Sequence, residues 1–478
     1  MNCIDMKTKI KIFAALTMLL VVLGTGCKKF LEVDPKSTIG EEELFNSEIG
    51  FQQALTGLYS QMASRDLYGD NLSMGFSSLI AQNYSTSLSG VFSFPTTVAL
   101  NFKGNDAVPL VSGIWTKGYN TIAAANNILS KIDNKQSIFT GNHYALVKGE
   151  ALGLRAYLHF DLLRLFGANF ATNPGKKAIP FRTELNALSK VPSTVDEVSA
   201  AILADLKTAE ALMKGKEPIA TEKSRRFRMN YYAIKALQAR VYLFRGDKIN
   251  AAAAANEVVN SGIFTLIDPK SVSAPAASRD RTFSTEQVFA IRVKDMRTWV
   301  ETDNAYFKSV SDNRKNLTRI LTDFQTLYET GAGGGTDIRF ANLIEADGLT
   351  YFCTKYWQTW VGTVENDRLD QNVSLMRLSE MYYILAETAA TPDEGLVFLN
   401  KVREKRVIPV IAAGITAQRL SEEITKEYQK DFYAEGQLFY YYKRKVANRM
   451  QFSSRNLTEA SYIVPVPDNE LEFNPNYN

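Results

Sequence analysis

The sequence predicts a mostly α-helical protein, in which paired helices form a scaffold that carries long loop-rich insertions and little β structure. Three observations predict this fold class. Apolar residues recur at spacings of three and four along most of the chain, which is typical of helices with one buried face. Short turns separate these stretches. The periodicity is lost around 84–102 and 262–368, where Gly, Ser, Thr, Asn, Asp and isolated aromatic residues dominate.

The first 27 residues have the features of an export signal. Basic residues precede a short apolar stretch, Ile12–Leu23, which is too short to span a bilayer, and Gly24-Thr25-Gly26 then precede Cys27. A cysteine directly after such small residues resembles a bacterial lipobox, whose thiol receives a diacylglyceryl group. We therefore expect residues 1–26 to be a lipoprotein signal peptide and Cys27 to be the lipid attachment site. Met6 is an alternative start, and a plain secreted protein is the alternative interpretation.

Four helices are expected in the first half of the body. Their apolar faces are Ile122–Ile132, Val147–Leu165, Val198–Leu212 and Ala233–Phe244. Thr194 with Glu197 three residues later forms a capping box, which marks the start of the third helix. Gly167 and Gly246 are expected to end the second and fourth helices.

Two more helices are expected near the C-terminal end. Leu375–Leu385 forms one apolar stripe, and Thr391-Pro392-Asp393-Glu394 favours initiation of the next helix. Alternating helices with short loops predict a tetratricopeptide-like scaffold, without a clean repeat period. We expect a single domain at 27–478. Its helical-pair scaffold would occupy about 40–261 and 370–478, and its ligand-facing insertions about 80–110 and 262–368.

Composition argues against several function classes. The chain has 55 basic and 51 acidic residues, so a concentrated basic face for nucleic acid is not expected. The body holds one cysteine, Cys353, and only two histidines, His143 and His159. His159 lies in an apolar helical run and is expected to be packed. The zinc-protease, phosphate-loop and EF-hand motifs are missing, so we expect no catalytic residues, no metal and no cofactor.

Several segments, in the right order from Cys27 to Asn478, resemble one family, the RagB/SusD lipoproteins. The resemblance rests on Phe30–Pro35, Gly149–Gly167, Ala236–Leu243, Met376–Tyr382, Leu399–Arg403 and the ending Tyr462–Pro467 with Asn474-Pro475-Asn476. Two departures exist. Gln437 and Tyr440 replace the polar pair expected near the C-terminal helix, and Lys28-Lys29 replace the acidic residues that often follow the lipidated cysteine.

The resemblance implies a lipid-anchored outer-membrane protein, exposed at the cell surface, that captures a nutrient. Such proteins cover a SusC-like TonB-dependent transporter and deliver a glycan or peptide to it without breaking bonds. Three alternatives stay open: capture of peptides or glycopeptides by the same lid mechanism, a surface glycoside hydrolase with two carboxylates, and a helical scaffold without affinity for small molecules. The sequence does not identify the ligand.

A glycan site needs flat aromatic rings beside hydrogen-bonding side chains. The two insertions supply these residue types, and Trp299 with Arg297, Asp303 and Asn304 is the most site-like local group. The alternative for each aromatic residue is that it packs a loop onto the scaffold. The predicted ligand-binding residues are Tyr84, Phe92, Arg297, Trp299, Asp303, Asn304, Tyr351, Trp357 and Trp360.

Overall fold

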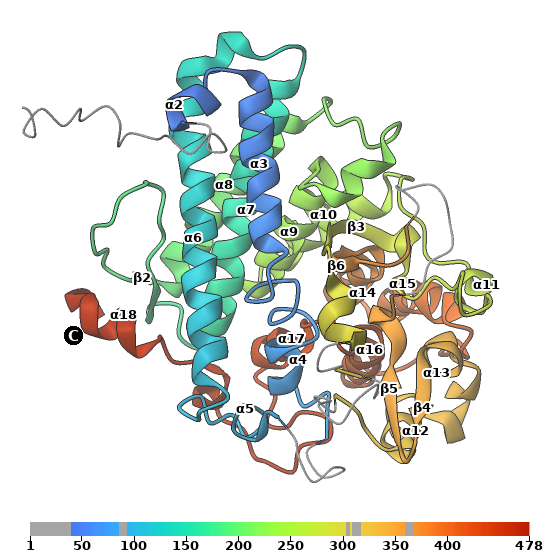
Figure 1. Cartoon of the computed structure of the whole chain (residues 1–478). Coiled ribbons are helices and arrows are strands. Elements are labelled where there is room, and N and C mark those ends of the chain that lie inside the picture. The colour runs from blue at the N-terminus through green and yellow to red at the C-terminus, as the bar shows by residue number, and fades with distance from the viewer. Residues whose placement is uncertain (1–39, 86–92, 303–305, 308–316, 359–367, 478) are drawn as a thin grey trace, which may run out of the picture.

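The computed structural model describes residues 40–85, 93–302, 306–307, 317–358 and 368–477. Figure 1 shows the long N-terminal helices side by side and the C-terminal helices gathered next to them. The α-helices are α2 Glu41–Leu44, α3 Glu48–Met62, α4 Phe76–Ile80, α5 Pro95–Val98, α6 Val108–Ile132, α7 His143–Phe166, α8 Val195–Met213, α9 Tyr231–Phe244, α10 Lys248–Val259, α11 Pro269–Val272, α12 Leu321–Leu327, α13 Ile338–Leu343, α14 Leu378–Thr388, α15 Pro392–Lys405, α16 Ala417–Asp431, α17 Leu438–Arg444 and α18 Asp468–Phe473.

Helix α7 lies at the centre of the N-terminal half and is buried on all sides from Gly149 to Phe166. It packs against α3, α6, α8 and α9 (Figure 1). Gly149 permits one of these close approaches, because a Cβ there would lie 2.5 Å from Met213 Cγ at the end of α8. The sequence predicts a single buried face for this helix. The structure differs because neighbouring helices cover the other faces as well.

Polar side chains on α7 are buried together with their partners. Arg155 donates to both carboxylate oxygens of Asp205 in α8, at 2.8 and 2.7 Å, and to Asn126 in α6 at 2.9 Å. His159 Nδ1 donates to the Arg155 carbonyl, and its Nε2 accepts from the Arg182 amide. Burial lowers the pKa of His159 to about 3, so the ring is neutral. The expectation of a packed histidine is confirmed.

The helix boundaries follow local sequence signals. Thr194 and Glu197 form the predicted capping box at α8, and Thr391 and Glu394 form another at α15 with Pro392 at its first position. Helix α9 ends just before Gly246, which adopts φ +77°. These signals are confirmed because each one satisfies backbone groups of its own helix end.

Among the described residues, the strands pair into three two-stranded antiparallel sheets. They pair β1 Lys177–Ile179 with β2 Ser193–Thr194, β3 Gln287–Arg292 with β6 Asn372–Arg377, and β4 Ile344–Asp347 with β5 Thr350–Cys353. The β3–β6 ladder runs from Gln287 opposite Arg377 to Arg292 opposite Asn372. The ladder therefore joins β3, near the beginning of the 262–368 insertion, to β6, the strand that follows the end of the insertion. The insertion is not entirely loop, since α11–α13 and β3–β5 lie within it.

Six fully buried charged side chains join the insertion to the C-terminal helices. Arg339 of α13 contacts Asp431 of α16 at 2.8 Å, and Arg406 after α15 contacts the same carboxylate at 2.9 Å. Each of these side chains is 0% exposed, and we call the six the Asp431 network. Its members are Glu286, Asp337, Arg339, Arg406, Glu427 and Asp431.

Further ion pairs extend the Asp431 network to the strands. Glu286, directly before β3, accepts from Arg406 at 2.7 Å and from Arg377 at the end of β6 at 3.2 Å. Arg377 continues to Glu435 at 3.0 Å, and Lys355 contacts that carboxylate at 2.6 Å. A continuous set of charge-assisted hydrogen bonds thus holds together residues 286, 337–339, 355, 377, 406 and 427–435.

We expect Asp431→Asn to lower the free energy of unfolding by about 3–5 kcal/mol, because it leaves desolvated guanidinium groups without their shared carboxylate. Urea denaturation of the mature protein measures the change. The matched control is Asp468→Asn, which removes a carboxylate from an exposed pair with Lys103 and should have little effect. Equal stability of the two variants would contradict the role given to Asp431.

The Asp431 network also predicts loss of stability in acid. Neighbouring cations lower the pKa of Glu427 to about 2 and hold the pKa of Asp431 well below its ordinary value, against the opposing effect of burial. Carboxyl groups with depressed pKa values stabilise the fold fully above their unfolded pKa of about 4. We expect the unfolding midpoint in urea to fall steadily as pH drops from about 4.5 towards 2. A midpoint that stays constant over this range would contradict the assignment.

Candidate functional site

A partly exposed surface forms where the turn after α3 meets the insertion. Asp70, whose side chain is 3% exposed, accepts from Arg65 Nη2 at 2.9 Å and Nε at 3.2 Å. Tyr306 donates its hydroxyl to the same Asp70 oxygen at 2.5 Å. Burial raises the pKa of Asp70, although Arg65 and Tyr306 oppose that effect. A buried carboxylate thus fixes an arginine and a tyrosine that are 241 residues apart.

Trp299 completes this surface. It lies on a π-helical turn, Thr298–Thr302, and is half-buried. The Arg65 guanidinium lies 5.3 Å from the Trp299 ring centroid and 5.8 Å from that of Tyr306, which is cation–π distance. The Arg65 side chain is 52% exposed. We call Arg65, Asp70, Trp299 and Tyr306 the Arg65–Trp299 surface.

The π-helical turn is anchored from a second segment. Glu301 accepts a hydrogen bond from the Gln358 amide, and its other oxygen lies 3.2 Å from Arg297 Nε. Gln358 in turn accepts from the Gln371 amide at 2.7 Å. The chain that carries Trp357 is therefore held alongside the turn that carries Trp299.

The structure separates the predicted site residues into different groups. Arg297 is exposed on the same turn as half-buried Trp299. Tyr351, on β5, is half-buried and its backbone pairs with Arg319. Trp357 is half-buried, with its ring 6.1 Å from that of Phe352. Cys27, Phe92, Asp303, Asn304 and Trp360 lie outside the described residues.

Tyr84 does not present its ring to a ligand, so this part of the site prediction is wrong. Its side chain is 2% exposed, and its hydroxyl donates to the Met74 carbonyl at 2.8 Å. The ring packs against Phe307 and Tyr433. Tyr84 is a loop aromatic residue with polar neighbours in the sequence. It lies in the core because the segments on both sides of it fold back onto α17 and residues 317–319.

Sequence reasoning missed Arg65, Asp70 and Tyr306. Arg65 and Asp70 lie in the turn between α3 and α4, where no periodic pattern marks them. Tyr306 lies in the insertion but has no feature that sets it apart from other tyrosines there. The available signal was the cluster of charged residues, Arg65, Asp66 and Asp70, directly after an apolar helix.

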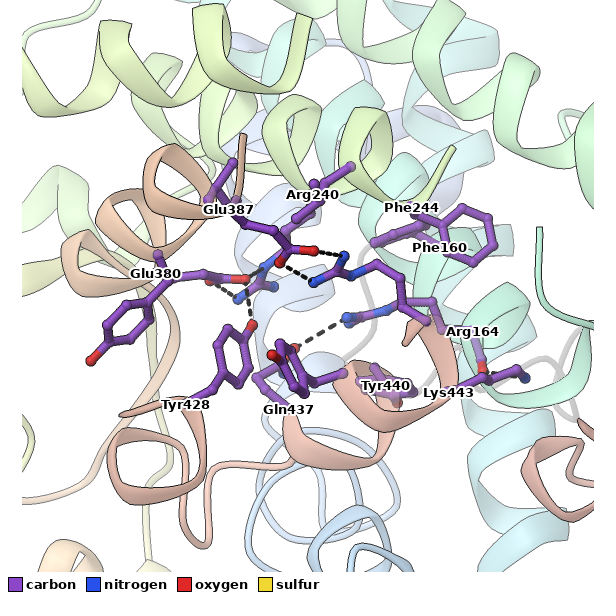
Figure 2. Close-up of a pocket in the computed structure, with 15 residues that line it drawn as sticks. Phe160, Arg164, Arg240, Phe244, Glu380, Glu387, Tyr428, Gln437, Tyr440 and Lys443 are labelled. Atoms are coloured by element: carbon purple, nitrogen blue, oxygen red, sulfur yellow. Dashed lines mark hydrogen bonds and ion pairs between the residues drawn. The ribbon is translucent and has the colours of Figure 1, made fainter. Parts of the chain in front are cut away.

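A cavity lies in the interior, between the N-terminal and C-terminal helices. Figure 2 shows its charged lining, in which Arg240 of α9 contacts Glu380 of α14 at 2.6 Å and Arg164 of α7 donates to Gln437 at 3.2 Å. Lys443 of α17 donates to the carbonyls of Arg164 and Gly167 at the end of α7. Burial lowers the pKa of Lys443 to about 7.

This interior cavity is too small for a sugar. Its volume is about 40 Å³, whereas ligand pockets occupy roughly 300–1,000 Å³ and a single water needs about 10–15 Å³. It has room for ordered water. Its paired charges join the two groups of helices and have no evident role in binding a nutrient.

Among the described residues, no three His, Cys, Asp or Glu side chains gather in a way that could hold a metal ion. Within the same residues, no helix has the length and apolar character needed to cross a membrane.

Two family models match separate parts of the chain. A SusD-like model described as "Starch-binding associating with outer membrane" matches residues 29–243, and the SusD/RagB model, described as "SusD family", matches residues 326–478. The first match covers helices of the N-terminal half, and the second match covers helices of the C-terminal half. Together they cover most of the chain.

Curated relatives come from Formosa agariphila. The chain is 25% identical to SusD-like protein P25 over 230 residues, which are 46% of this chain and 40% of that protein. It is 20% identical to SusD-like protein P38 over 463 residues, covering 85% of this chain and 84% of that protein.

Solved structures share the fold. A SusD superfamily protein from Bacteroides thetaiotaomicron superimposes with a TM-score of 0.71 at 21% identity, covering 90% of this chain and 98% of the other. A putative sugar binding protein from Bacteroides vulgatus gives 0.70 at 22% identity, covering 90% and 97%. The fold is therefore the all-α, tetratricopeptide-like fold of these proteins. With both family models matched in order, this chain belongs to the SusD/RagB family.

Proposed function

We propose that this chain is a lipid-anchored, cell-surface protein that binds a nutrient glycan and passes it to a partner TonB-dependent transporter of the outer membrane. The description of the matched family model, which names starch binding and outer-membrane association, supports this proposal. In it, residues 1–26 form the signal peptide and 27–478 a single domain. The protein binds its ligand without breaking bonds.

The Arg65–Trp299 surface is the observation that carries the glycan part of the proposal. Sugars present weakly apolar C–H faces and rings of hydroxyl groups, so they suit a flat aromatic ring with hydrogen-bonding side chains beside it. Trp299 offers the ring, and the half-exposed Arg65 side chain offers donors. Asp70 fixes Arg65 in place, which reduces the conformational entropy lost on binding.

The other predicted residues extend this proposal around the same surface. Arg297 lies on the Trp299 turn, and Gln358 holds the segment of Trp357 next to that turn. Tyr351, Trp357 and the residues outside the described ranges, Phe92, Asp303, Asn304 and Trp360, stay proposed ligand contacts. Peptide capture is the alternative that a binding panel separates from glycan capture.

We expect Trp299→Ala to weaken binding of the preferred glycan at least about tenfold, equivalent to ~1.4 kcal/mol, because the ring supplies the flat contact surface. Thermal-shift screening of the mature protein against glycans and peptides identifies the ligand, and calorimetry then compares the variants. Phe473→Ala, which removes an exposed aromatic ring outside the Arg65–Trp299 surface, is the control and should leave affinity unchanged.

Three outcomes would contradict the proposal that the Arg65–Trp299 surface binds a glycan without cleaving it. Trp299→Ala could bind the glycan as tightly as the parent. The panel could contain stabilising peptides and no stabilising glycan. Incubation with the bound glycan could release shorter products, which would favour a surface glycosidase over a binding protein.

We expect Cys27→Ser to release the protein from membranes, because the lipids that the thiol would carry can no longer be attached. Each buried methylene contributes about 0.8 kcal/mol, so one acyl chain holds a protein marginally and two or more hold it durably. Fractionation of cells that express the full chain measures the partition. Membrane retention equal to that of the parent would contradict the lipid anchor.

A further inference from the structure

A further pocket lies at the start of β3 and shares no lining residue with the Arg65–Trp299 surface. Gln287, the first residue of β3, lies in its lining, whereas Trp299 lies on the π-helical turn that comes after the strand. The polar lining comes from a 3-10 turn, Lys223–Phe227, from the chain after α10 and from the start of β3. We call it the Lys223 pocket, and its polar side chains are Lys223, Arg226, Ser261, Thr265, Thr285 and Gln287.

The Lys223 pocket has the size of a ligand site. Its volume is about 420 Å³, which falls within the range of roughly 300–1,000 Å³ for pockets that bind small molecules. The interior cavity of Figure 2 is about 40 Å³. A group larger than a few water molecules therefore fits in the Lys223 pocket and does not fit in the interior cavity.

The charged side chains of the lining, among the described residues, are of one sign. Lys223 and Arg226 are basic, and none of the described lining residues is acidic. Of the neighbouring carboxylates, Glu286 is held by Arg406 and Arg377, and Glu222 lies in the lining of a different pocket. An anionic group is therefore attracted to this pocket, and a cationic group is repelled.

The arrangement of the pocket is fixed by its own hydrogen bonds. Arg226 donates to the Ser284 carbonyl at 3.1 Å and to the Lys223 carbonyl at 3.2 Å, so its charge is held in place. Thr265 and Thr285 are joined by two hydrogen bonds, at 3.1 and 3.0 Å. A pocket formed in advance costs little to order on binding.

Hydroxyl and amide groups accompany these charges. Gln287 is 1% exposed and donates through Nε2 to Ser374 at 3.0 Å. Its Oε1 is shielded from solvent and has no hydrogen-bond partner in the part of the chain that the structure describes. Ile219, Ile263 and Phe264 form an apolar wall. Cations, neutral polar groups and an apolar wall together match a ring that bears hydroxyl groups and one carboxylate.

We propose that the Lys223 pocket is a second ligand site, which binds a sugar unit carrying a carboxylate. The carboxylate lies at Lys223 and Arg226, and the sugar hydroxyl groups face the exposed side chains of Thr265 and Thr285. Because the Trp299 ring plays no part in it, this site recognises the charge of a glycan unit independently of the Arg65–Trp299 surface.

Calorimetry or saturation-transfer NMR with D-glucuronate, D-glucose and inorganic phosphate tests the proposal on the mature protein. We expect saturable glucuronate binding at least about tenfold tighter than glucose binding, equivalent to ~1.4 kcal/mol. Phosphate should bind more weakly than glucuronate because it lacks the ring. Added salt should weaken glucuronate binding, because the lysine is exposed to solvent.

Lys223→Met is the deciding variant, since an exposed side chain can be changed without disturbing the fold. It should weaken glucuronate binding about fivefold or more, within the range for hydrogen bonds to charged groups. Lys216→Met, an exposed lysine outside the pocket, is the matched control and should bind as the parent does. Trp299→Ala should also keep glucuronate binding, which separates this site from the proposed glycan surface.

Two sets of results would overturn the proposal. Glucuronate could bind no better than glucose or phosphate, which would remove the sugar carboxylate as the recognised group. Alternatively, Lys223→Met could bind glucuronate like the parent, or Trp299→Ala could abolish that binding, and either result would place the ligand elsewhere.

Discussion

The buried carboxylate of Asp431 is the constraint on which the second half of the molecule depends. It accepts from Arg339 of α13 and from Arg406 after α15, and all three side chains are shielded from water. Charges in such a position are tolerable only with complete and well-aligned partners, so the helices that carry them have little freedom to shift. Glu286, directly before β3, pairs with Arg406, so the same constraint extends to the start of this strand. A core of hydrocarbon alone would fix the position of this strand less specifically.

The two binding proposals are linked through β3. Its first residue lines the Lys223 pocket, and the chain after its last residue carries Trp299. Within the Arg65–Trp299 surface, Asp70 holds Arg65 and Tyr306 in the same way, as a desolvated carboxylate between two donors. The protein thus uses buried carboxylates both to assemble its scaffold and to position a group that faces solvent.

The sequence predicted the helical scaffold well, because its signals are local. Apolar spacing and the capping boxes at Thr194 and Thr391 each act within a few residues. The candidate site was predicted only in part, because its geometry depends on contacts between distant segments. Trp299 and Arg297 were identified by composition, whereas Arg65 meets Tyr306 across 241 residues. Tyr84 shows the reverse error: polar neighbours in the sequence do not reveal that the folded chain covers its ring. Full burial of Arg339 and Arg406 has no local signature either.

The β3–β6 ladder has a consequence for how proteins of this architecture change over time. Because Arg292 lies opposite Asn372, the ladder joins the two ends of the intervening chain and leaves its length unconstrained at that point. The entropic cost of closing such a loop grows only with the logarithm of its length, about 0.6 kcal/mol for each doubling. Insertions and deletions in this chain are therefore inexpensive for the scaffold where they fall outside the segments that ion pairs hold, 337–339 and 355. Those stretches can change in length over time while the helical body stays the same.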